Sequence, residues 1–230
     1  EKYQVPVIVM TDLFLATQLR AIDRDAFDFD RVVIDRGETI LPEQLDQSAN
    51  GYHRYEITES GISPRAIPGS AKGVYVAVGD EHTVEGRITE DAEIRTQQMQ
   101  KRLRKLDVIA KEMRLPTLVG PTDAELTLVG WGSTYGSLVE AAKLLNTSGL
   151  STNVLHFTDI WPLQWDRVAE LLQRCRKLVV VEQNYTGQLA NVLQTYTGVR
   201  IPLRINKYDG RQISPDEIIA RLQKGVLVGV

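Results

Sequence analysis

The feature that most constrains the fold is a regular alternation of short apolar runs and longer amphipathic stretches in the second half of the chain. The strand-like runs are Leu126–Val129, Val154–Phe157, Leu178–Val181 and Pro202–Ile205. The helical stretches run roughly over 135–145, 165–175, 187–196 and 215–222. Strands that alternate with helices of this length form a parallel sheet flanked by helices. We therefore predict an α/β domain over residues 121–230.

Size and charge exclude several classes of protein. The chain has 230 residues and a formal net charge of −3, which argues against a nucleic-acid or anionic-membrane surface. No apolar run approaches the ~20 residues that a membrane helix needs. Cys175 is the single cysteine, so the chain has no internal disulfide and cannot by itself hold an iron–sulfur cluster, which usually takes about four thiolates. We expect a reducing, cytoplasmic location.

The first 36 residues contain one clear core element. Val5–Met10 is a continuous apolar, β-branched run, the pattern of a buried parallel strand. Thr11-Asp12 is expected to cap a short helix over Leu13–Leu19, and Arg31–Ile34 fits a short strand. A chain that opens on a core strand, with nothing before it to pair with, is expected to be a piece of a longer protein.

Residues 37–120 have the pattern of a linker that includes one long helix. Residues 37–73 are rich in turn formers, and apolar side chains are available for burial at Tyr52, Tyr55, Ile57, Ile62 and Ile67. Val74–Val78 fits a short strand. A helix opens near Thr89 and ends at Pro116, with a length of ~36 Å. Its apolar residues repeat at intervals of four and three, as in a coiled-coil seam: Met99, Leu103, Leu106, Ala110 and Met113.

The loop from Gly79 to Asp91, GDEHTVEGRITED, carries more charge than a connection needs. Three interpretations are open for its charged residues, Asp80, Glu81, His82 and Glu85. They could bind a divalent metal, although zinc sites usually draw a further ligand from elsewhere. His82 beside two carboxylates could act as an acid or base near neutral pH. The third interpretation, a solvated or interface loop, is the one we favour.

Two further segments lie where strands of the predicted sheet end. Gly130–Gly136, GWGSTYG, is placed like a dinucleotide phosphate loop, with Asp159 as a possible ribose ligand, but the third glycine is displaced. A tight turn with Ser133 or Thr134 as helix cap is the favoured interpretation. The second segment, 182–185, fits either a ligand site or a buried polar network at a subunit interface. We expect Cys175 to be structural, and Trp161 and Trp165 to be core or interface anchors.

Several segments together resemble the alpha subunit of 2-oxoacid:ferredoxin oxidoreductases. Val5–Leu15 resembles the last strand and helix of its pyrimidine-binding domain, which places residues 1–36 at the end of that domain. Gly61–Gly69, GISPRAIPG, resembles the linker motif of the 2-oxoglutarate type, and Gly79–Asp91 follows it as in the family. Segments 132–145 and 181–193, the latter VEQNYTGQLANVL, resemble the transketolase C-terminal-like domain.

The resemblance implies a thiamine-diphosphate-dependent enzyme that decarboxylates 2-oxoglutarate to an acyl-CoA and passes electrons to ferredoxin. It also implies that thiamine diphosphate, magnesium and the iron–sulfur clusters are held by the beta subunit or other parts of the heteromer, so this piece is inactive alone and binds none of them. Its partners are then the beta subunit, the remaining part of the alpha subunit, ferredoxin and CoA. The family's Tyr-Pro-Ile-Thr-Pro motif does not occur in this sequence.

By the same resemblance, Asp80, Glu81 and His82 border the active site. The sequence departs from the family there, because Thr83-Val84 stands where Asp-Glu commonly follows the histidine. Two alternatives remain for the whole chain. One is a subunit of the sister enzyme for pyruvate or branched-chain 2-oxoacids, and the other is a non-catalytic α/β binding module.

Overall fold

The structure, a computed structural model, describes residues 1–9, 11–46 and 51–225. Its contacts divide the chain into two compact units. The first unit comprises Glu1–Val9 and Arg20–Ile109, and the second comprises Met10–Leu19 and Ala110–Val230. Helix α3 (Ala92–Glu112) lies mainly in the first unit.

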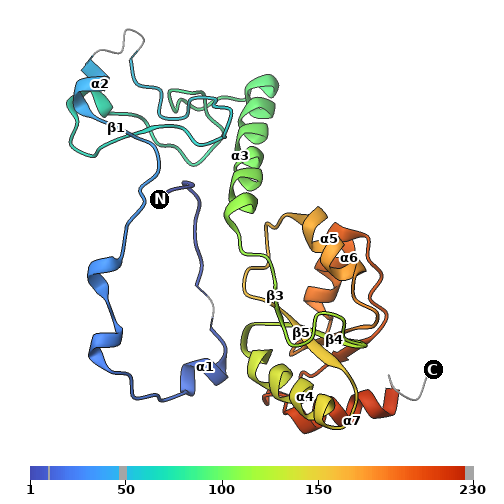
Figure 1. Cartoon of the computed structure of the whole chain (residues 1–230). Coiled ribbons are helices and arrows are strands. Elements are labelled where there is room, and N and C mark those ends of the chain that lie inside the picture. The colour runs from blue at the N-terminus through green and yellow to red at the C-terminus, as the bar shows by residue number, and fades with distance from the viewer. Residues whose placement is uncertain (10, 47–50, 226–230) are drawn as a thin grey trace. The chain divides into compact units, whose positions relative to one another are not determined.

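The second unit contains a five-stranded sheet in the order β3-β5-β4-β6-β7. Figure 1 labels its strands β3, β5 and β4. The strands are β3 Thr117–Val119, β4 Leu126–Trp131, β5 Thr152–Phe157, β6 Leu178–Glu182 and β7 Arg204–Asn206. Strands β4 to β7 pair in parallel, which confirms the predicted parallel sheet. The sequence did not predict β3, which is antiparallel to β5 at the edge. Three residues are too few for strand periodicity to show.

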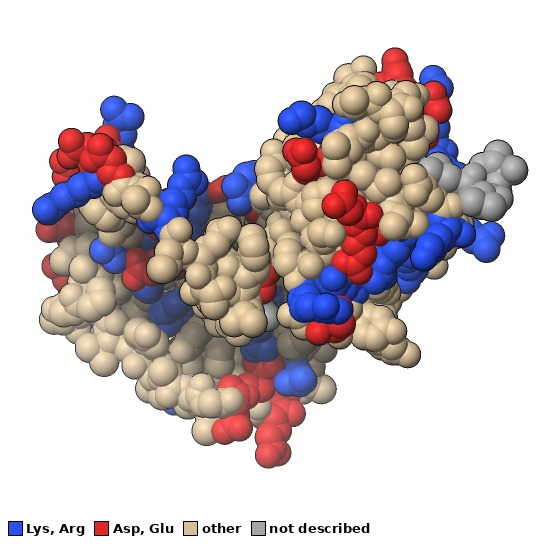
Figure 2. Space-filling view, turned by 90° about the horizontal axis from the view of Figure 1, so that it is seen from below, with Lys and Arg blue, Asp and Glu red and all other residues tan. Residues whose placement is uncertain are grey.

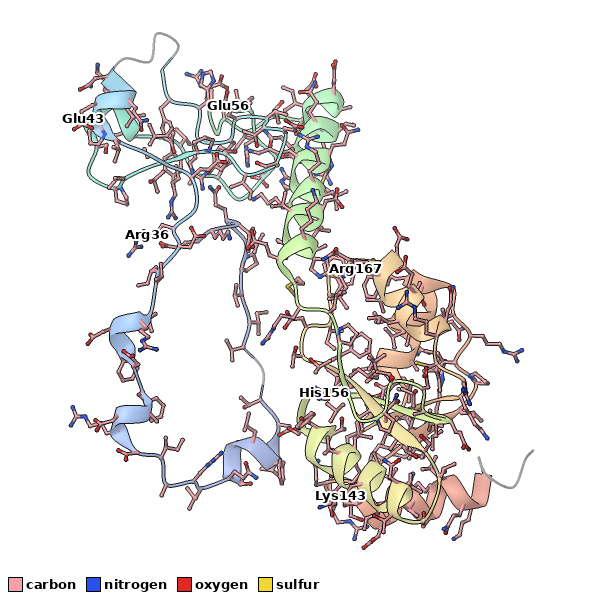
Figure 3. All side chains as sticks on the ribbon, in the orientation of Figure 1. Arg36, Glu43, Glu56, Lys143, His156 and Arg167 are labelled. Atoms are coloured by element: carbon pink, nitrogen blue, oxygen red, sulfur yellow. The ribbon has the colours of Figure 1, made fainter. Side chains whose placement is uncertain are left out.

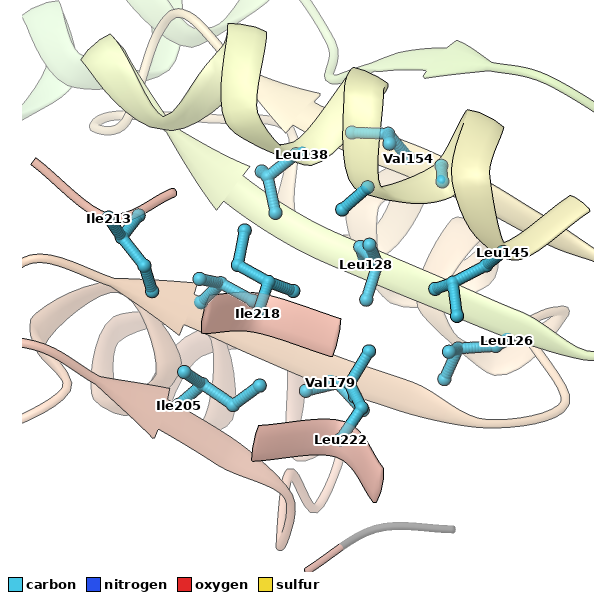
Figure 4. Close-up of a cluster of buried hydrophobic side chains, with 13 residues drawn as sticks. Leu126, Leu128, Leu138, Leu145, Val154, Val179, Ile205, Ile213, Ile218 and Leu222 are labelled. Carbon is cyan, nitrogen blue, oxygen red and sulfur yellow. The ribbon is translucent and has the colours of Figure 1, made fainter. Parts of the chain in front are cut away.

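Helices cover both faces of this sheet, as predicted. They are α4 Tyr135–Thr147, α5 Trp165–Gln173, α6 Gln188–Thr197 and α7 Pro215–Gly225. Side chains of α4 and α7 pack with Leu128 in one buried cluster (Figure 4), and those of α5 and α6 pack with Val129 in the other. Neighbouring residues of β4 point to opposite faces, because side chains alternate along a strand. Both faces are therefore apolar, as a buried parallel strand requires.

The first unit contains little regular structure apart from α3. Its short elements are β1 Thr39–Ile40 and β2 Arg65–Ala66, which pair in parallel, and α2 Pro42–Asp46. Three single turns of 3₁₀-helix complete it: η1 Arg24–Ala26, η2 Phe29–Arg31 and η3 Ala71–Gly73. Of the apolar residues expected to be buried in this stretch, Ile62 is buried and Tyr52 and Tyr55 are half-buried. Ile57 and Ile67 are exposed, contrary to expectation.

Three predicted strands are absent from the described residues. Val5–Val9 has no strand partner there, and its side chains at Val7, Ile8 and Val9 are 79%, 84% and 85% exposed; Met10 lies outside the described residues. The other two absent strands are 31–34 and 74–78. β-Branched composition favours an extended chain, but a strand forms only where another strand offers hydrogen bonds. The short helix after Asp12 is confirmed as α1 (Leu13–Thr17), with the Asp12 carboxylate accepting the Leu15 N–H at 2.8 Å.

Helix α3 is confirmed, but its start and its buried face differ from expectation. It begins at Ala92 rather than near Thr89, because the Asp91 carboxylate accepts the N–H groups of Glu93 and Ile94 at 2.9 Å each. The buried residues of the helix are Gln98 and Lys101. On the predicted seam, Met99 and Leu103 are exposed. The predicted apolar seam is therefore not the face that packs in this unit.

On the face shown in Figure 2, acidic and basic side chains are interspersed, as the small net charge leads one to expect. Among the described residues, no helix is both long enough and apolar enough to cross a membrane.

Candidate active-site border

A tight hairpin in the first unit carries the charged segment. His82 forms an antiparallel bridge with Ile88, and the Thr89 N–H donates to the Glu81 carbonyl at 3.0 Å. The chain reverses at Gly86, which has φ +89° and lies so close to the Val76 carbonyl that a Cβ would meet its oxygen at 2.0 Å. Only glycine satisfies both demands without strain. The turn thus fixes Glu81 and His82 at the base of the hairpin, just before α3.

Glu81 is the most constrained of the candidate residues. Its side chain is 8% exposed, and its carboxylate accepts hydrogen bonds from the guanidinium groups of Arg102 and Arg95, the latter at 3.3 Å. The hydrogen bond from Arg102 holds the pKa of the Glu81 carboxyl below its usual range, against the opposing effect of burial. Glu81 is therefore an anion at neutral pH that fastens the hairpin to α3.

A depression of about 500 Å³ opens beside this ion-pair cluster. It is lined by Val78, Gly79, Asp80, Glu81, His82, Arg95 and Arg102. Asp80 is exposed there, and no hydrogen bond or ion pair joins it to another residue in the described part of the chain. The structure thus brings all three predicted residues to one polar, open site.

His82 lies against an aromatic cluster. Its ring centroid is 4.0 Å from that of Tyr55, and its Nδ1 lies 3.0 Å from the Thr83 carbonyl oxygen. Tyr55 also meets Tyr75 edge-on at 6.0 Å, and burial raises the pKa of the Tyr55 phenol. The imidazole is thereby oriented by a tilted ring contact and by one backbone contact.

Glu85, the fourth charged residue of the loop, turns away from this site. Its carboxylate accepts the Thr83 hydroxyl at 2.6 Å and lies 3.7 Å from His53 Nε2. That hydroxyl lowers the pKa of the Glu85 carboxyl. No group of three His, Cys, Asp or Glu side chains in the described ranges is arranged to hold a metal ion. The Glu81 carboxylate is already engaged by arginines, which does not fit the metal interpretation.

The chemistry available at the depression follows from these contacts. Glu81 is not a proton donor near neutral pH, whereas His82 carries an imidazole, the side chain that most often serves as a catalytic acid or base. Arg95 and Arg102 can contact an anion through the N–H groups that Glu81 leaves free. Sequence reasoning missed both arginines. Their spacing of seven residues on a predicted helix was the available signal, since it places them on one face.

The Gly130–Gly136 segment is a strand-to-helix turn, as favoured. A single 3₁₀ turn, η4 (Gly132–Thr134), leads into α4. Thr134, one of the two predicted candidates, is the N-cap residue of α4, but its side chain makes no capping hydrogen bond. Its hydroxyl donates back to the Trp131 carbonyl at 2.7 Å instead. A Cβ at Gly130 would meet Leu138 Cδ1 at 2.4 Å, so this glycine permits close packing of helix on strand. Asp159, the suggested ribose ligand, is paired with Arg114 at 2.7 Å.

The polar cluster after β6 has a structural role within the unit. Glu182 is fully buried, and its carboxylate accepts the backbone N–H groups of Leu189 and Ala190 at 2.7 and 3.0 Å. The Asn184 side chain accepts the Gly187 N–H at 2.7 Å. The cluster therefore caps the N-terminal end of α6, where unpaired N–H groups need acceptors. It matches the expected buried polar network, although it lies inside this unit.

The tryptophans and the cysteine occupy ordinary positions. Trp165 packs against the core of α5 and α6 and stacks on Tyr196 with ring centroids 4.6 Å apart, while Trp161 is 46% exposed. The Cys175 thiol donates to the Leu171 carbonyl at 3.3 Å. Of Trp161 and Trp165, the two tryptophans expected to be anchors, Trp165 packs on the described core of this unit.

Comparisons with known proteins place this geometry in context. The family model of the transketolase C-terminal domain matches residues 117–223. Over 97% of its length the chain is 35% identical to the alpha subunit of 2-oxoacid:ferredoxin oxidoreductase 2 of Aeropyrum pernix. It is 32% identical to the corresponding subunit of Saccharolobus solfataricus over 98% of its length. It covers 34% and 36% of those relatives, so the chain spans about a third of their length.

A solved structure is similar over most of the chain. This is the 2-oxoglutarate:ferredoxin oxidoreductase of Magnetococcus marinus, determined with 2-oxoglutarate, coenzyme A and succinyl-CoA bound. The TM-score is 0.74 at 26% identity, and the match covers 85% of this chain and 33% of that one. Most of the chain therefore shares its fold with that enzyme.

Proposed function

Since the chain belongs to the 2-oxoacid:ferredoxin oxidoreductase alpha-subunit family, a family of oxidoreductases, we propose that it is the C-terminal part of an alpha subunit that acts on 2-oxoglutarate. The observation that carries the proposal is the similarity, over 85% of the chain, to the Magnetococcus marinus enzyme. A 2-oxoglutarate oxidoreductase subunit of Mycobacterium tuberculosis, 36% identical over 46% of the chain, supports the choice of substrate.

Within that enzyme, residues 1–36 complete a pyrimidine-binding domain. Residues 37–120 connect it to the α/β domain of residues 121–230, which forms subunit contacts. Asp80 and His82 face the reaction site from its border, held in place by the Glu81 ion pairs with Arg95 and Arg102. Thiamine diphosphate, magnesium and the iron–sulfur clusters belong to other parts of the heteromer, which also meets ferredoxin and CoA. For the iron–sulfur clusters, the sequence supports this assignment, because Cys175 is its single thiol.

Reconstitution tests this function. We expect the chain, combined with the remaining part of the alpha subunit and a beta subunit, to support thiamine-dependent reduction of a viologen dye by 2-oxoglutarate and CoA. Pyruvate and a branched-chain 2-oxoacid should react more slowly. Faster turnover of either would identify that 2-oxoacid, rather than 2-oxoglutarate, as the preferred substrate. No activity with any 2-oxoacid after verified assembly would refute the proposal.

The role of the border is tested by matched histidine variants of the assembled enzyme. His82→Asn removes the imidazole at the depression, and we expect turnover to fall by at least about a hundredfold, the lower end of what proton-transfer groups contribute. His53→Asn changes the imidazole beside Glu85 and should leave turnover within about twofold. Equal effects of both variants, or none from His82→Asn, would remove His82 from the reaction site.

A further inference from the structure

Helix α3 carries a buried lysine, Lys101, in the first unit. Lys101 is 4% exposed, and the loop at Gly61 packs directly on its backbone. A Cβ at Gly61, which has φ +77°, would lie 2.2 Å from the Lys101 carbonyl oxygen. Lysine is almost never fully buried without a partner, because its ammonium loses its hydration. The position therefore requires an explanation.

Two further cations surround Lys101 without a carboxylate of their own. Lys105 follows four residues later on the helix, and its Nζ donates to the Gln4 carbonyl at 3.1 Å. Arg54, from the loop packed on α3, donates to the Gln4 side-chain oxygen at 3.0 Å. These acceptors are neutral. In the part of the chain that the structure describes, no carboxylate forms an ion pair with Lys101, Lys105 or Arg54.

The charged groups that act on Lys101 are cations, with one exception. The charged groups that act on Lys101 are Lys105 and Arg102 from α3 and Arg54 and Glu56 from the loop. Arg102 is neutralised by Glu81, and Glu56 is an exposed residue of that loop (Figure 3). Burial, together with the neighbouring cations, lowers the pKa of the Lys101 ammonium to about 8.

Donor atoms without acceptors accompany this excess of charge. The Nε groups of Arg54 and Arg104 are buried and have no hydrogen-bond partner. The ammonium of Lys101 also has no hydrogen bond to another described residue, but its nitrogen is not one of the fully buried unpaired atoms. Buried donors that remain unpaired commonly mark the place of a water or an ion. Here both hydrogen-bond donors and positive charge are in excess. An anion would accept hydrogen bonds from the donors and balance the charge.

We propose that Lys101, Lys105 and Arg54 form a binding site for a small oxyanion, a phosphate or a carboxylate, between α3 and residues 51–64. Such a ligand supplies the missing countercharge and accepts charge-assisted hydrogen bonds from the lysine and arginine donors. The Gly61 loop, packed on the Lys101 backbone, keeps the helix face and the loop in register. The site is separate from the depression at Asp80 and does not depend on the function proposed above.

Calorimetry on the 230-residue chain tests the site, with inorganic phosphate in one arm and succinate in the other. Binding in either arm supports the site, and the tighter arm identifies the ligand class. Lys101→Met keeps the length of the side chain and removes its charge, and we expect it to weaken binding at least tenfold. Lys111→Met, on an exposed residue of the same helix, should leave binding unchanged.

Two further measurements separate binding from folding. At the same ligand concentration, the melting temperature should rise more for the wild type than for Lys101→Met. Without ligand, Lys101→Met should melt no lower than the wild type, because it removes an unpaired buried cation. Succinate stays fully ionised above pH 7, so its affinity should fall about tenfold from pH 7 to pH 9 as Lys101, with its pKa of about 8, loses its proton. No binding of either anion, or equal binding by wild type and Lys101→Met, would overturn the proposal.

Discussion

Glu81 shows how one side chain can join two parts of a unit. It precedes Arg102 by 21 residues, and the carboxylate is buried while both arginines reach solvent. A buried carboxylate is costly unless it is paired and hydrogen-bonded, and here two guanidinium groups supply the pairing. The residue therefore supports the geometry of the depression, whatever reaction takes place beside it.

Replacing Glu81 with glutamine should destabilise the protein by about 1–3 kcal/mol at pH 7, because Arg102 loses its charged partner while remaining partly solvated. The pKa of Glu81 is lowered in the folded state, so its stabilising effect is present above the unfolded value of about 4.5 and is lost as the pH falls through the folded value. Urea unfolding of wild type and Glu81→Gln should therefore converge at acidic pH.

The control for this prediction is Glu90→Gln, which changes an exposed acid of the same segment. We expect it to alter the free energy of unfolding by no more than about 0.5 kcal/mol. A gap between wild type and Glu81→Gln that stays constant down to about pH 3, below the usual range of a carboxyl pKa, would contradict the assigned role of the carboxylate.

Single residues of the candidate site were predictable to different degrees. Asp80, Glu81 and His82 are adjacent in the chain, so their composition alone indicated a polar site. Arg95, Arg102 and Tyr55 were not expected there, because their proximity depends on how the hairpin and the loop at Tyr55 pack against α3. Helical spacing relates the two arginines to each other but not to Glu81.

At the level of elements, the hairpin depends on a glycine that meets two demands at once. Gly86 has a positive φ, and a Cβ added to it would lie 2.0 Å from the Val76 carbonyl oxygen. Gly69 has a similar φ of +93°, but a Cβ added there would have no atom within 4 Å. The two glycines therefore share the conformational demand and differ in steric crowding.

Gly86→Ala should cost at least about 1 kcal/mol more in unfolding free energy than Gly69→Ala, because only the former also forces backbone atoms apart. Thermal and urea unfolding of both variants measure this difference. Equal losses would show that the φ angle alone decides the effect and that the hairpin can relax away from Val76.

For helix α3, the apolar periodicity of the sequence predicted the helix but not the face that is buried. The seam of Met99, Leu103 and Leu106 is real in the sequence, and a helix does form there. Which face is buried depends on what packs against it, and in this unit the loop at 51–64 packs against Gln98 and Lys101. An isolated pattern predicts an apolar face but does not identify its partner.

At the scale of the whole molecule, three consecutive apolar residues near the start of the sequence lie exposed to solvent. Val7, Ile8 and Val9 are more than three-quarters exposed. Apolar side chains exposed in succession commonly mark an interaction surface. The chain spans about a third of its curated relatives' length, and the proposed pyrimidine-binding domain would provide strands to cover this segment.

Adding the remaining part of the alpha subunit should therefore slow hydrogen exchange at the backbone amides of residues 7–9 by at least about tenfold, since a strand in a sheet exchanges only on opening. Mass spectrometry of the peptide that contains these residues provides the measurement, and residues 154–157 of the buried strand β5 serve as an internal reference. Unchanged exchange at residues 7–9 in a verified assembly would refute the placement of this segment.

The sequence by itself determined the parallel sheet, its four covering helices and the family. Those features rest on periodicity and on motifs within a few residues, which act locally along the chain. The tertiary structure alone decided the edge strand β3, the buried face of α3 and the contacts of Glu81 with Arg102 and of Lys105 with Gln4, which are 101 residues apart. The physical reason is that burial and charge pairing are properties of the surroundings, and distant segments supply those surroundings.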